Sequence, residues 1–72
     1  MNKTAQELLE IREALGTYKQ ALGYKEMIIK DDKAKDHVLK AYNCIQRAIE
    51  QIVLAIDTVN HSVSYYNENK DG

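Results

Sequence analysis

The longest regular pattern in the chain lies in residues 38–59, which read VLKAYNCIQRAIEQIVLAIDTV. Bulky apolar residues recur there at alternating steps of four and three, a spacing that keeps them on one face of an α-helix. They are Val38, Tyr42, Ile45, Ile49, Ile52, Ile56 and Val59, and the spacing continues to Val63 and Tyr66. This sustained heptad pattern predicts a long helix, over about residues 32–66, that packs along another helix.

A second row of residues, which we call the alanine row, runs beside the first along the same predicted helix. Its members are small and stand seven residues apart: Ala34, Ala41, Ala48, Ala55 and Ser62. Small side chains let another helix approach closely. Two rows of different character therefore predict two packing partners for this helix.

A shorter heptad pattern precedes the long one. Its members are Leu8, Ile11, Leu15, Tyr18, Leu22 and Ile29, interrupted by Lys25. Thr4-Ala5-Gln6-Glu7 has the form of a capping box, so we expect the first helix to cover about residues 4–30. The polar residues Asp31-Asp32-Lys33 predict a short turn in which one aspartate caps the next helix. Residues 67–72 have no apolar anchor and are expected to fray.

The predicted fold is all-α: one domain over residues 1–72, formed by a two-helix antiparallel hairpin. A chain of 72 residues has a thin core. Its single cysteine, Cys44, excludes an intramolecular disulfide and is expected at or near the core. The second helix is longer than the first, and Val53 and Leu54 widen its apolar surface. We therefore expect the hairpin to assemble into a homo-oligomeric helical bundle.

Charge limits the classes of partner. The net charge of -1 argues against binding to duplex nucleic acid, which normally requires a dense basic face. Residues 19–40 nevertheless hold six lysines against four acids, so the turn end is mildly basic. This fits either a solvated surface of mixed charge or attraction for a small anionic ligand. Neither a membrane-spanning run nor a signal-peptide pattern is evident, which favours a cytoplasmic protein with no membrane partner.

Signatures of catalysis and of metal binding are absent from the sequence. His37 and His61 stand too far apart along one helix to share a metal ion. Cys44 has no histidine at helical spacing that would take its proton. We therefore predict that the chain is not an enzyme and has no catalytic residue, metal or cofactor.

Two glycines inside the first predicted helix are the most suggestive local feature. Gly16 and Gly23 each cost about 1 kcal/mol relative to alanine in a helix interior. Because they stand seven apart, they share one face and open a shallow groove, flanked by Arg12, Lys19 and Lys30, with Tyr24 after the second glycine. The groove could admit a neighbouring helix or a flat anionic ligand, with a base stacked on tyrosine and phosphate held by arginine or lysine.

The segment from Ile45 to Ile56 resembles the phage-encoded anti-CBASS and anti-Thoeris sponges, which sequester the cyclic nucleotide signals of anti-phage immunity. Those proteins carry a helical hairpin whose second helix has the pattern Leu-Gln-x-Gly/Ala-hydrophobic-x-x-Leu-x-x-Ala-Ile. Two further segments are similar to the family. Asp36 to Ala41 resembles the entry to that helix, and Glu10 to Gly16 resembles a Glu-Ile-Lys-Ala-Leu-Gly stretch of the first helix with one residue inserted.

The resemblance implies a homo-oligomer, a hexamer, that binds cyclic di- or trinucleotides between subunits without cleaving them, in the host cytoplasm if the protein is phage-encoded. It also implies phosphate contacts from Arg12, where the family has lysine, and from Arg47 beside Gln46. The family's Gly-Tyr-Arg element ahead of the first helix has no counterpart here, so Tyr24 is the expected substitute for stacking. An alternative function is a self-associating module that binds a helix of a partner protein.

Overall fold

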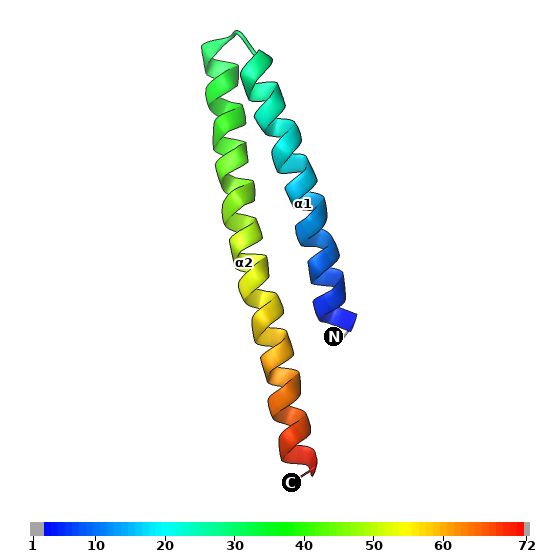
Figure 1. Ribbon diagram of the computed structural model, residues 1–72. Coiled ribbons are helices and arrows are strands. Elements are labelled where there is room, and N and C mark those ends of the chain that lie inside the picture. Colours follow the sequence, from blue (N-terminus) through cyan, green and yellow to red (C-terminus); the bar gives the residue numbers. More distant parts are fainter. Residues whose placement is uncertain (1–2, 72) are drawn as a thin grey trace.

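The protein folds into a hairpin of two helices. The computed structural model describes the backbone of residues 3–71 and the side chains of residues 3–61. Helices α1 (Lys3–Ile28) and α2 (Asp32–Asp71) run antiparallel and are joined by a short turn over residues 29–31 (Figure 1). The predicted all-α hairpin is confirmed. Because α1 has 26 residues and α2 has 40, the C-terminal part of α2 extends past α1.

The turn is closed by Asp31, which caps α2. One carboxylate oxygen of Asp31 accepts a hydrogen bond from the backbone N–H of Ala34 at 2.9 Å. Its carbonyl oxygen accepts the N–H of Lys35, also at 2.9 Å. An aspartate cap was predicted from the sequence and is confirmed, since the side chain satisfies one of the free amides of the first turn.

The helix ends differ slightly from the predicted ones. Helix α1 begins at Lys3, so Thr4 lies in the first turn and not at the cap position that the capping-box pattern indicated. At the other end, α2 continues to Asp71, beyond the predicted end near residue 66, because no glycine or proline interrupts it. The predicted fraying concerns motion and stays a prediction, and Gly72 lies outside the described residues.

Asp31→Ala should lower the free energy of unfolding by about 0.5–2 kcal/mol, because it leaves the Ala34 amide without its side-chain acceptor. Asp32→Ala is the matched control. Asp32 lies in the first turn of α2, where it makes only the smaller helix-dipole contribution of about 0.3–1 kcal/mol. Urea denaturation followed by circular dichroism compares the two, and equal losses would contradict the capping role of Asp31.

The α2 side of the contact follows the sequence pattern. The seven apolar residues from Val38 to Val59 that form the heptad row are all half-buried. Val63 and Tyr66, the last two members, lie outside the described side chains. On α1, Leu8, Leu15 and Leu22 are likewise half-buried, as predicted, and so is Ile29 in the turn.

The prediction is wrong for the remaining two of the six residues in this shorter pattern. Ile11 and Tyr18 are 50% and 63% exposed, whereas Lys19 and Glu26 are half-buried beside α2. Lys19 and Glu26 each come one residue after a position of the predicted heptad pattern, so they lie about 100° further round the helix than that pattern. On this side Gly23 lets Tyr42 of α2 approach the backbone of α1, with 3.6 Å between its Cε2 atom and the position of a Cβ atom on Gly23. Long charged side chains can lie there because their stems rest on apolar surface while their heads reach water.

This rotation leaves an apolar stripe on α1 without a partner in the chain. We call it the outer stripe. It consists of Ile11, Ala14, Tyr18, Ala21 and Ile28, all exposed. Among residues 3–61, Ala5 is the only residue that is fully buried. The accessible surface of 5808 Å² also exceeds the roughly 4,600 Å² expected for a compact monomer of 8.3 kDa, so the single hairpin hides little from water.

Candidate functional site

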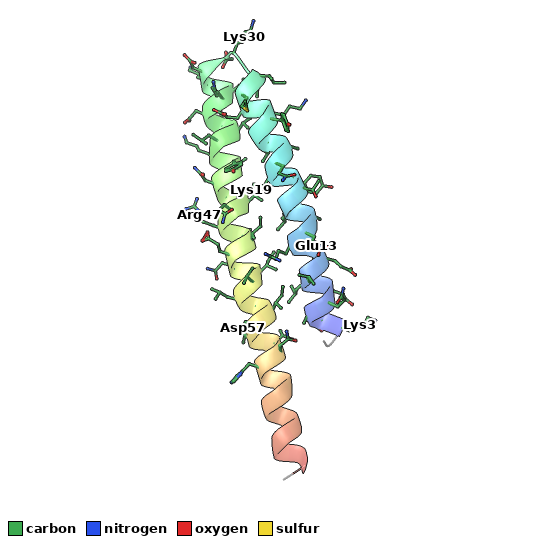
Figure 2. The ribbon with its side chains drawn as sticks, in the orientation of Figure 1. Lys3, Glu13, Lys19, Lys30, Arg47 and Asp57 are labelled. Carbon is green, nitrogen blue, oxygen red and sulfur yellow. The ribbon has the colours of Figure 1, made fainter. Side chains whose placement is uncertain are left out.

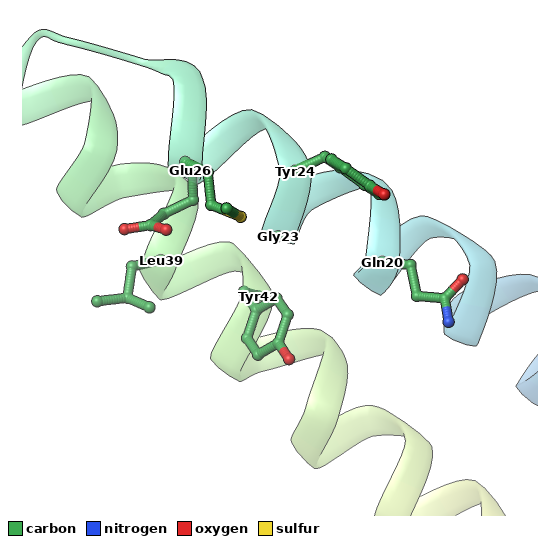
Figure 3. A pocket seen from close by; sticks show the side chains of 7 residues that line it. Gln20, Gly23, Tyr24, Glu26, Leu39 and Tyr42 are labelled. Carbon is green, nitrogen blue, oxygen red and sulfur yellow. The ribbon is translucent and has the colours of Figure 1, made fainter.

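The candidate site is an open groove of about 580 Å³ near the turn, between α1 and the start of α2. Its walls are apolar and aromatic, with one amide and one carboxylate among them. The lining residues are Gln20, Gly23, Tyr24, Glu26, Met27, Leu39 and Tyr42. Figure 3 shows Tyr24 and Tyr42 on opposite sides of the groove, Glu26 beside Leu39 at the turn end and Gln20 at the far end.

Gly23 keeps the floor of the groove shallow between the two tyrosines. A Cβ atom at this position would lie 3.6 Å from Cε2 of Tyr42, which is an ordinary van der Waals contact. Tyr42 therefore packs closely over the backbone of α1, while Tyr24 is 74% exposed on the other side. One ring is held against the floor, and the other is exposed at the opposite edge of the groove.

A polar cluster borders the groove on its N-terminal side along α1. The ammonium group of Lys19 donates to Oε1 of Gln46 and lies 5.1 Å from the centre of the Tyr42 ring, within the range of a cation–π contact. The amide nitrogen of Gln46 donates in turn to Glu50 at 3.1 Å. The hairpin thus holds a cation over the aromatic ring that also lines the groove.

The sequence predicted seven binding residues, and the hairpin brings four of them together. Gly23 and Tyr24 line the groove, and Lys19 and Gln46 form the adjoining cluster. The others do not line it. Arg12 is exposed further toward the N-terminus, and Gly16 is half-buried beside open space. Arg47 lies on the side of α2 turned away from α1, where its guanidinium contacts the sulfur of Cys44 at 3.7 Å (Figure 2).

Five lining residues were not predicted from the sequence as site residues: Gln20, Glu26, Met27, Leu39 and Tyr42. The three that belong to α1 reach the groove because α1 turns its glycine side toward α2, and the other two belong to α2. In the sequence, only the seven-residue spacing of Gly16 and Gly23 pointed to this side of α1. Cys44, expected at or near the core, is exposed, because its position on α2 lies outside the contact with α1.

The turn end carries mixed charge. Lys40 forms an ion pair with Asp36 at 2.9 Å, one helical turn away on α2. The hydrogen bond from Lys40, together with its positive charge, lowers the pKa of the Asp36 carboxyl. The stabilisation from this pair is therefore present above the pKa of an unfolded aspartate and is lost as pH falls through the lowered value. Lys40 is engaged with Asp36, whereas Lys19 faces the groove side of the hairpin.

Gly16→Ala should raise the free energy of unfolding of the hairpin by about 0.5–1 kcal/mol, because a Cβ atom there meets nothing within 4 Å and alanine favours the helix. Gly23→Ala, with Tyr42 at 3.6 Å, is the comparison at the groove. Thermal denaturation at several protein concentrations measures both. A loss of stability in Gly16→Ala would contradict this expectation and would mean that another backbone approaches this glycine in solution.

Within residues 3–61, no group of three or more histidine, cysteine, aspartate or glutamate side chains is placed to hold a metal ion. Neither helix, over its described part, has an apolar stretch of the length that a bilayer requires. Comparison of the chain with protein families, with curated proteins and with solved structures gave no match.

Proposed function

We propose that this chain is a non-catalytic binding module that assembles with copies of itself and sequesters the cyclic di- or trinucleotide signals of anti-phage immunity. The observation that carries the proposal is the juxtaposition of Lys19, Tyr42 and the groove floor at Gly23. A cyclic oligonucleotide presents flat bases and a ring of phosphates. Tyrosine rings stack on bases, and lysine and glutamine side chains bind phosphate and ribose oxygens.

Self-assembly forms part of the proposal, and the exposed apolar surface supports it. Gly23 and Leu39 line the groove on one side of the helix contact. The outer stripe of α1 lies on the opposite flank of its helix, and helical spacing puts the described members of the alanine row, Ala34 to Ala55, on the opposite flank of α2, so both face the other side of the hairpin. A second copy that covers this side buries the outer stripe and leaves the groove open. Arg47, which points away from its own groove, is then available to a neighbouring copy.

Lys19→Met should weaken nucleotide binding by about 10- to 100-fold, because it keeps the apolar stem over Tyr42 and removes a charged hydrogen-bond donor worth about 1.5–3 kcal/mol. Lys40→Met removes the same charge from a lysine that pairs with Asp36 outside the groove, and it should change the affinity by less than about threefold. Calorimetry with a panel of cyclic di- and trinucleotides measures both variants. Absence of binding by the unmodified protein across the panel would remove the proposed function.

A second candidate function is favoured by the spacing of the outer stripe. Ile11, Tyr18 and Ile28 stand on one exposed face of α1, with Ala14 and Ala21 between them, as in helices that receive a partner helix. In this alternative the partner is a helix of a different protein. A pull-down from host lysate tests it, and a closed homo-oligomer in which the outer stripe is covered would count against it.

A further inference from the structure

We propose that the groove selects guanine bases, and that the carboxylate of Glu26 is the residue that does so. The inference rests on the proposed function, since it names the base that the same groove accepts. It starts from the one charged side chain among the lining residues. Glu26 is half-buried at the turn end of the groove, where Figure 3 shows its carboxylate beside Leu39.

The carboxylate of Glu26 is free to bind a ligand. It makes no hydrogen bond or ion pair with any residue that the structure describes. An ionised carboxylate only accepts hydrogen bonds, and its two oxygens can accept from two neighbouring donors at once. A ligand that binds here must therefore present adjacent donors and an apolar body that fits against Tyr24, Met27 and Leu39.

Among the common bases, guanine alone has two adjacent donors on its Watson–Crick edge, the N1–H and the N2 amino group. Adenine and cytosine present one amino group next to a ring nitrogen that accepts, and that acceptor would face a carboxylate oxygen. Uracil presents one N–H between two carbonyl groups. Only guanine satisfies both oxygens of Glu26 without placing a lone pair against them.

The remaining groups fit the same orientation. A guanine whose Watson–Crick edge meets Glu26 lies between the rings of Tyr24 and Tyr42, on which it can stack. Its sugar and phosphate then point along the groove, away from the turn and toward Lys19. The excess of lysines over acids in residues 19–40, six against four, reduces the repulsion between Glu26 and the phosphates.

The test uses calorimetry of the full chain with three probes: cyclic di-GMP, its inosine analogue cyclic di-IMP, and cyclic di-AMP. The unmodified protein should bind cyclic di-GMP at least tenfold more tightly than cyclic di-AMP, with the inosine analogue between them because it lacks the N2 amino group. Glu26→Gln should remove most of the preference for cyclic di-GMP, since an amide offers one acceptor and one donor, which match N6 and N1 of adenine and equally N1 and O6 of guanine.

Gln20→Ala is the control, because Gln20 lines the far end of the groove and should change the affinities for all three probes by a similar factor. Equal binding of the guanine and adenine probes by the unmodified protein, or an undiminished preference for the guanine probe in Glu26→Gln, would overturn the role of Glu26 and leave the proposed function standing. The inosine comparison needs no variant, so it decides the matter even if a substitution disturbs folding. Absence of binding to every cyclic nucleotide would overturn the proposed function and the base selection together.

Discussion

Replacing Ile11 and Tyr18 together by glutamate is expected to abolish self-assembly. Both side chains are at least half exposed in the single hairpin, at 50% and 63%, so the substitutions disturb little within one chain. In an assembly that covers the outer stripe they would remove about 1.5–3 kcal/mol of apolar burial per residue. They would also bury two unpaired charges at each contact, which costs several kcal/mol more.

The control for this variant carries the same added charge on another face of α1. Gln6 and Thr17 are exposed and lie outside the outer stripe, so Gln6→Glu with Thr17→Glu should leave the assembly intact. Sedimentation velocity gives the mass of both proteins, and circular dichroism gives their helix content. An unchanged mass in the Ile11 and Tyr18 variant would mean that assembly, if it occurs, uses a different surface.

Ile49→Ala is expected to have the second large effect, a loss of about 2–4 kcal/mol in the free energy of unfolding. Ile49 lies in the middle of the α2 heptad row and is half-buried against α1. Truncation removes apolar contact and leaves a cavity in a core that is only one layer thick. A domain of this size has a total stability of only about 4–10 kcal/mol, so the variant should be largely unfolded at moderate denaturant concentrations.

Leu54→Ala is the matched control for Ile49→Ala. It removes the same number of carbon atoms from the same helix, but Leu54 is 58% exposed on the side of α2 that faces away from α1. Its expected loss is below about 0.5 kcal/mol. Urea denaturation of the two variants side by side measures the difference, and similar losses would show that the far side of α2 is buried as deeply as the helix contact.

The sequence was sufficient to predict the hairpin because each of its parts has a local cause. Asp31 caps a helix wherever its side chain meets free amides, and the heptad row from Val38 to Val59 is apolar on one face only. Both features can be recognised without knowing which helix packs against α2. The turn and the buried face of α2 were therefore predicted correctly.

The face that α1 presents to α2 could not be predicted in the same way. Its apolar residues form a band wide enough for two partners, and periodicity does not say which part of the band the adjoining helix covers. The hairpin uses the side with Gly16, Gly23 and Lys19, so Ile11 and Tyr18 are left outside. This stripe, patterned for burial but unused within the chain, is the surface on which the proposed self-assembly rests.

The candidate site was predicted only in part for the same reason. Lys19 was predicted as a charge beside the glycine groove, and Gln46 was predicted from its place in the family pattern. Nothing in the sequence indicated that these two side chains form a hydrogen bond. Glu26 and Leu39 face each other across the turn only because α1 is rotated. Contacts between helices depend on that rotation, which is a property of packing and not of either helix alone.

The most direct test is sedimentation equilibrium combined with circular dichroism over a dilution series from high micromolar to nanomolar protein. A hairpin with its outer stripe exposed should be found as a multiple of 8.3 kDa at high concentration and should lose helix content as it dissociates. A particle of 8.3 kDa that keeps its full helix content at every concentration would contradict the claim that the two helices need further copies to shield their apolar faces.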